Sequence, residues 1–196
     1  MTGNELGKLF GTPLSYKDNI QTMDIRTTNG SLIDQNYVPS KNAKDVSKLG
    51  KEDAITLGKT NMHEYAFGIT TTNEHYGAVK NPWDTEYISG GSSGGSAASV
   101  ATNQTIASLG TDTGGSIRIP VAACGIVGLN PTNGKISTKG IAGISWTLDN
   151  LGPLAANMSD LAIMMEALTD NLYSEYCIDD IRGLRIGVPT TFLIKT

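Results

Sequence analysis

The sequence GTDTGGSIRIP, residues 110–120, combines the composition of a loop with a set of reactive side chains. Six of its eleven residues are Gly, Ser or Thr, which is typical of turns and linkers. The same stretch holds an acid at Asp112, a serine after two glycines at Ser116, and an arginine at Arg118. Because an apolar run follows without a break, the pattern favours a backbone shaped around Ser116 over a flexible linker.

A second glycine–serine cluster, GGSSGGS at residues 90–96, lies upstream and also leads directly into an apolar run. Twelve of the 23 glycines lie between residues 90 and 143. Small residues at this density imply elements that pack backbone against backbone. The pattern predicts a helix after Gly95, a strand near 105–110, a helix that opens at Gly115 or Ser116, and a buried strand near 126–129.

The flanking segments continue this alternation of strands and helices. Three runs predict strands, PLSYKD at 13–18, AITLGK at 54–59 and LRIGVP at 184–189, and TNMHEYAF at 60–67 predicts a helical turn or two. Leu161, Met164, Met165 and Leu168 have the spacing of an amphipathic helix, with Ser159 as its N-cap. The alternation indicates an α/β fold with a largely parallel sheet.

The composition excludes several classes of protein. A chain of 196 residues can form one domain with a core, and a net charge of −4 without a basic stripe gives no indication of direct nucleic-acid binding. Cys124 and Cys177 form no spaced motif, so neither a disulfide framework nor a zinc site is indicated. No apolar run approaches a membrane span of roughly 20 residues, and the N-terminus lacks the apolar core of a signal peptide. We expect a cytoplasmic protein without cofactor or metal.

The two glycine-framed serines raise the question of which base could activate them. Residues 90–94 match the G-x-S-x-G elbow of α/β-hydrolases, but that fold places its histidine after the serine. Both histidines, His63 and His75, precede Ser92, and a His–Asp–Ser order would require an all-β barrel. Lysine is the remaining common base. Lys17 lies in the strand-like run GTPLSYKDNI, where position alone favours a solvated lysine at the end of a strand.

Taken together, these segments resemble the amidase signature family. GGSSGGSAASVA at 90–101 and LGTDTGGSIRIPVAACGIVGLNPT at 109–132 resemble its signature, and GTPLSYKDNI at 11–20 resembles its lysine strand. The resemblance extends from about Leu9 to Pro189. It implies part of the amidase signature fold, with a mixed, mostly parallel sheet flanked by helices.

The resemblance also implies roles for particular residues. Ser116, which lies 24 positions after Ser92, is the expected nucleophile; Ser92 is the bridging serine after a cis peptide bond, and Lys17 is the base. The backbone N–H groups of four residues form the expected oxyanion hole, namely Thr113, Gly114, Gly115 and Ser116. Three further residues are expected to support the site, Asp112 and Arg118 as a scaffold beneath it and Ser93 through local hydrogen bonds.

The sequence departs from the family pattern in what surrounds these motifs. Members carry helices before the lysine strand and a long C-terminal half, so residues 1–196 are expected to be one partial domain with its core motif region at about 80–150. Asn130 stands where lysine is usual. Three hypotheses remain open. The first is an amidase that acts on a small-molecule amide and could form a homodimer. The second is the A subunit of the glutamyl-tRNA(Gln) amidotransferase, which works with partner subunits, and the third is an inert remnant. The sequence leaves the substrate undetermined.

Overall fold

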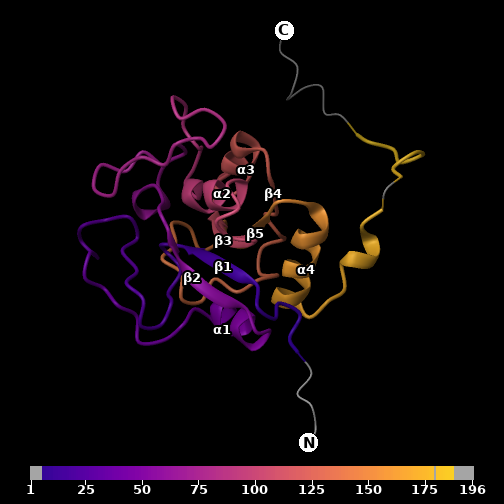
Figure 1. The fold of residues 1–196 in the computed structure, drawn as a ribbon, viewed down its shortest axis with the longest axis horizontal. Coiled ribbons are helices and arrows are strands. Elements are labelled where there is room, and N and C mark those ends of the chain that lie inside the picture. The colour runs from indigo at the N-terminus through magenta and orange to yellow at the C-terminus, as the bar shows by residue number, and fades with distance from the viewer. Residues whose placement is uncertain (1–5, 179, 188–196) are drawn as a thin grey trace, which may run out of the picture.

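A five-stranded mixed sheet forms the centre of the computed structural model, which describes residues 6–178 and 180–187 (Figure 1). The strands are β1 (Pro13–Lys17), β2 (Ile55–Thr60), β3 (Ala107–Asp112), β4 (Val127–Gly128) and β5 (Asn150–Ala155), and their order in the sheet is β2-β1-β3-β5-β4. β1 pairs in parallel with β2 and β3, whereas β5 is antiparallel to β3 and β4. The predicted mixed α/β sheet is confirmed, but its expected mostly parallel character is not, because β5 runs antiparallel to both of its neighbours and two of the four strand pairs are therefore antiparallel.

Helices cover both faces of the sheet (Figure 1). They are α1 (Lys44–Lys51), α2 (Gly94–Ala101), α3 (Arg118–Cys124) and α4 (Met158–Thr169), with short 3-10 turns η1 (Glu64–Ala66) and η2 (Ser174–Tyr176). α1 and α4 pack on one face over a core that includes Leu14, Tyr16 and Leu109. α2 and α3 pack on the other face over a smaller apolar cluster around Ile117 and Leu154. Within the described residues, no helix has the length and apolar character needed to cross a membrane.

The amphipathic helix predicted near the C-terminus is α4, and its apolar residues are buried as expected. Leu161, Met164 and Leu168 all belong to the larger core. The N-cap prediction was wrong: the cap is Asn157, whose Oδ1 accepts a hydrogen bond of 2.9 Å from the backbone N–H of Asp160. The helix begins at Met158, so Ser159 lies inside its first turn, beyond the capping position.

Three other predicted elements differ from the structure. The strand expected near 126–129 is only β4, and it is half-buried because it forms one edge of the sheet. The helix expected to open at Gly115 or Ser116 begins at Arg118. Residues 184–187 of the predicted strand LRIGVP have no regular secondary structure, and its last two residues lie outside the described part of the chain.

The layer between the sheet and α2 is polar as well as tightly packed. Hydroxyl groups of Ser15 and Ser108 are 2.9 Å apart, and Ser99 adds a further hydroxyl contact to Ser15. At Gly95, the backbone of α2 approaches the segment after β2 so closely that a Cβ would lie 2.3 Å from Asn61 O. Close backbone packing and buried hydroxyls therefore account for a chain rich in glycine and serine.

Candidate active site

β1 places Lys17 inside the molecule. Leu14 and Tyr16 point into the larger core, so the alternation of a strand turns Lys17 to the opposite face, toward α2. Its side chain is fully buried, and Nζ lies 2.7 Å from Ser92 Oγ and 2.8 Å from Thr111 Oγ1. The solvated lysine that position alone favoured is therefore wrong.

The environment of Lys17 favours the neutral form of its amine. Burial lowers the pKa of its amine from 10.5 to about 7, although the carboxylates of Asp112 and Asp149 act in the opposite direction. An amine with this pKa is neutral in a large fraction of molecules near pH 7 and can accept a proton. Sequence analysis missed Thr111, whose hydroxyl and carbonyl oxygens lie 2.8 Å and 3.5 Å from Nζ.

Ser92 is held at the entrance to α2. It is fully buried, the Gly91–Ser92 peptide bond is cis, and its carbonyl oxygen accepts a hydrogen bond of 3.2 Å from the His63 N–H. The Thr71 hydroxyl donates to the carbonyl oxygen of Gly90 at 2.8 Å, which fixes the chain just before the serine. The hydroxyl of Ser92 thus has a defined position against Lys17.

Asp112 organises the turn that carries Ser116. Its buried carboxylate accepts hydrogen bonds from Gly115 N at 2.7 Å and Ile117 N at 3.1 Å. The half-exposed Arg118 guanidinium donates to both carboxylate oxygens, at 3.0 Å and 3.1 Å. Burial alone would raise the pKa of Asp112, but these hydrogen bonds, from Arg118 first, hold it below its ordinary value. The carboxylate therefore stays charged and braces the turn.

The bond to Asp112 also limits which backbone groups can face a substrate. The Gly115 N–H, one of the four expected oxyanion donors, points to Asp112 Oδ1. In the described part of the chain, the N–H groups of Thr113, Gly114 and Ser116 have no protein acceptor. These three remain available for a ligand.

Ser116 lines an open cavity of about 290 Å³. The other lining residues are Ala66, Phe67, Gly68, Ile69, Thr113, Gly114 and Ile144. The Ser93 N–H donates to the Ser116 carbonyl at 3.1 Å, so the two serine segments are in contact. Among the described residues, the hydroxyls of Ser92 and Ser116 are not hydrogen-bonded to each other, and such contacts often tighten only when substrate binds.

Ser93 and Cys124 serve the scaffold around the site. The Ser93 hydroxyl donates to the Thr111 carbonyl at 3.1 Å and accepts from the Thr111 N–H at 3.3 Å. These bonds join the start of α2 to β3. The prediction that Ser93 forms local hydrogen bonds was therefore wrong. Cys124 is fully buried in the smaller apolar cluster.

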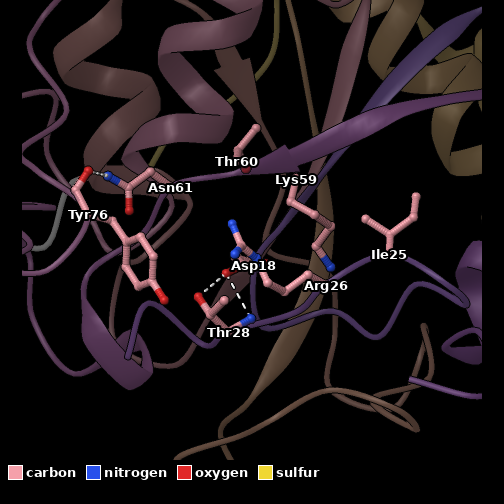
Figure 2. Close-up of a pocket in the computed structure, with 8 residues that line it drawn as sticks. All are labelled: Asp18, Ile25, Arg26, Thr28, Lys59, Thr60, Asn61 and Tyr76. Atoms are coloured by element: carbon pink, nitrogen blue, oxygen red, sulfur yellow. Dashed lines mark hydrogen bonds between the residues drawn. The ribbon is translucent and has the colours of Figure 1, made fainter. Parts of the chain in front are cut away.

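A second cavity, of about 340 Å³, lies at the carboxyl ends of β1 and β2 (Figure 2). Asp18 lines it and accepts hydrogen bonds from the Thr28 backbone and hydroxyl. Lys59 also lines it, but its Nζ donates to the hydroxyls of Thr22 and Thr27, at 3.1 Å each, and to a carbonyl. Ser92, Ser116 and Lys17 do not line this cavity, so it is separate from the candidate active site.

The titratable side chains do not gather elsewhere in a way that suggests metal binding. Across residues 6–178 and 180–187, no group of three His, Cys, Asp or Glu side chains is placed to hold an ion. His63 Nδ1 lies 3.3 Å from the Thr70 hydroxyl, and His75 pairs with Glu64 at 3.5 Å.

The fold and the site define an amidase-type protein, and the chain belongs to the Amidase family, which it matches over residues 1–193. It is 43% identical over 198 residues to the A subunit of the glutamyl-tRNA(Gln) amidotransferase of Methanosarcina mazei, covering 95% of this chain. The solved structure of the same kind of subunit from Thermotoga maritima has a TM-score of 0.82 and 42% identity, covering 85% of this chain and 37% of that one. The peptide amidase PAM, solved with the competitive inhibitor chymostatin, has a TM-score of 0.79 and 39% identity, covering 83% of this chain and 34% of PAM. The chain spans 42% of the length of the M. mazei relative.

Proposed function

We propose that Lys17, Ser92 and Ser116 form the triad of an amidase-type serine hydrolase that cleaves a carboxamide C–N bond through an acyl-enzyme. One observation carries the proposal: a fully buried lysine amine lies 2.7 Å from the hydroxyl of Ser92. Burying a charged amine costs free energy, so burial favours the neutral form, and a buried lysine with a shifted pKa is typical of a functional base.

The contact between Lys17 and Ser92 supports the first of two steps in a proton relay, and the second requires the hydroxyls of Ser92 and Ser116 to come together when substrate binds. The two N–H groups of a neutral Lys17 can donate to the oxygens of Thr111, which leaves its lone pair for the hydroxyl proton of Ser92. Ser92 in turn accepts the proton of Ser116, whose Oγ attacks the amide carbonyl carbon. The C–N bond breaks as the proton returns through Ser92 to the leaving amine. Water then hydrolyses the ester and frees Ser116.

The developing oxyanion requires preorganised donors. The free N–H groups of Thr113, Gly114 and Ser116 lie on the turn that Asp112 braces, so they need little rearrangement when charge develops. Removing one such donor in a serine hydrolase costs about 10²–10³ in kcat. The scaffold role proposed for Asp112 and Arg118 follows from the same contacts.

A second candidate is a glutaminase-type A subunit that works with partner subunits. The amidotransferase relatives that are 42–44% identical over nearly the whole chain favour it. Release of ammonia from glutamine, absent with simple arylamides and stimulated by partner subunits, would identify this function. Turnover of a simple amide by the chain without partners would identify the general amidase.

Covalent labelling tests the triad directly. Incubation with a small serine-reactive phosphonate should add one adduct to the intact mass of the protein, and Ser116→Ala should remove it. Folded protein that takes no adduct would contradict the triad and favour an inert remnant. An adduct that persists in Ser116→Ala would place the nucleophile at another residue.

A further inference from the structure

We propose that Asp149 is a positioning residue, which ties the oxyanion turn at Thr113 to the loop that carries Ile144 on the wall of the same cavity. The inference rests on the proposed function of Ser116, because it assigns a role in shaping that site.

The sheet itself brings Asp149 to this position. β3 and β5 pair antiparallel, and Asp112 is the register partner of Asn150 at the end of the ladder. Thr113 follows Asp112 and Asp149 precedes Asn150, so the two residues lie opposite each other one step beyond the last pair. The end of the sheet therefore places a carboxylate beside the oxyanion turn.

The carboxylate of Asp149 uses both oxygens. Oδ1 accepts a hydrogen bond of 2.5 Å from the hydroxyl of Thr113. Oδ2 accepts from the backbone N–H groups of Ile144 at 2.8 Å and Ser145 at 2.9 Å. The residue is 7% exposed, and a Cβ on Gly143 would lie 2.3 Å from Oδ2. A side chain at position 143 would therefore displace the carboxylate of Asp149 from this position.

These contacts connect two sides of one cavity. Thr113 and Ile144 both line the space in front of Ser116, and Asp149 is bonded to each of them. A shift of about 1 Å in reacting groups can cost on the order of 100-fold in rate. Loss of the Asp149–Thr113 bond should therefore disturb the oxyanion donors without touching the nucleophile.

The test compares the rate of phosphonate labelling in matched variants. Thr113→Val keeps the shape of the side chain but removes its donor, and should slow labelling by roughly 10- to 100-fold. Thr113→Ser restores the hydroxyl and should stay within about 3-fold of the original rate. Thr147→Val removes a hydroxyl that contacts Ser145 Oγ in the same loop, but not Asp149, and should leave the rate unchanged.

The pH profile of labelling separates positioning from a general loss of structure. Two charged groups act on Lys17 in the described chain: Asp112 from β3, which is paired with Arg118, and Asp149 before β5. Asp149→Asn removes one of them, so the midpoint of the profile should move to lower pH. Thr113→Val keeps the charge and should slow labelling without moving the midpoint.

The outcomes distinguish the two proposals. If the unaltered chain is labelled and Thr113→Val reacts equally fast, the assignment of Asp149 is overturned and the triad stands. If the unaltered, folded chain takes no adduct, the proposed function fails and this inference fails with it. Should Asp149→Asn not fold, the pair Thr113→Val and Thr113→Ser decides the matter, since a slow Val variant with a normal Ser variant supports the proposal.

Discussion

Lys17 must lose its charge before it can act as a base, and the structure supplies the reason for that loss. Its amine is enclosed between β1, α2 and β3, where an ammonium group is poorly solvated. Ser92 and Thr111 satisfy its hydrogen-bonding groups in the neutral form. At the scale of the residue, the proposed catalysis would depend on a titration of Lys17 near neutral pH.

We expect the rate of phosphonate labelling at Ser116 to rise with pH, with a midpoint near 7. Below this pH Lys17 is protonated and cannot accept the proton of Ser92; above it the neutral base predominates. Rates measured by intact mass between pH 5 and pH 9 would show the profile. Lys17→Arg keeps a cation that does not deprotonate and should abolish labelling across the range. A flat profile would show that Lys17 is not the base.

The sequence predicted the three residues of the proposed triad because each lies in a motif with a distinctive pattern. It missed Asp149, and it missed Thr111 although Thr111 lies in the quoted stretch 110–120, because the importance of both arises from cross-strand neighbours. The distance between Asp149 and Thr113 depends on the register of β3 and β5, which local patterns do not reveal. The engaged N–H of Gly115 was also beyond prediction, since it depends on the rotamer of Asp112.

At the scale of the element, the turn between β3 and α3 is built around one buried carboxylate. Asp112 ends β3, and its oxygens satisfy the N–H groups of Gly115 and Ile117 before α3 begins. Because Arg118 is half-exposed, its ion pair with Asp112 is screened by solvent, whereas the backbone bonds are not. Asp112 should therefore contribute more to the stability of the turn than Arg118 does.

We expect Asp112→Ala to lower the free energy of unfolding by about 3 kcal/mol, since it leaves buried N–H groups without acceptors. Arg118→Met should cost about 1 kcal/mol or less, because the carboxylate keeps its backbone donors. Urea unfolding at pH 7 measures both values. Equal losses would mean that the ion pair, and not the backbone bonds, stabilises the turn.

Helices and strands could be predicted where the hydrophobic periodicity was strong. Their exact ends and their burial could not, because these depend on contacts with residues distant in the sequence. α4 was recognised from four apolar positions, but its first residue depended on Asn157 reaching the N–H of Asp160. β4 was expected to be buried because Ile126, Val127 and Leu129 are apolar. Its place at the edge of the sheet follows from pairing with β5, a non-local contact.

At the scale of the whole molecule, the sheet presents an apolar edge. β2 pairs with β1 on one side, and Ile55 and Leu57 are 52% and 58% exposed. Within the described residues, β2 is the last strand at this end of the sheet. An edge strand with unpaired backbone groups and exposed apolar side chains is a site for association with another chain.

We therefore expect the purified chain to self-associate through β2 in a concentration-dependent way. The double variant Ile55→Lys with Leu57→Lys places charge on the edge, which opposes strand pairing, and should shift the sedimentation coefficient toward the monomer. Ile33→Lys is the matched control, because Ile33 is 81% exposed but lies in a loop outside the strands of the sheet. It should leave association unchanged.

Equal effects of both changes would show that association follows general surface hydrophobicity, whereas an effect confined to β2 would identify the edge. Phosphonate labelling should survive in the double variant, because neither side chain lines the cavity at Ser116.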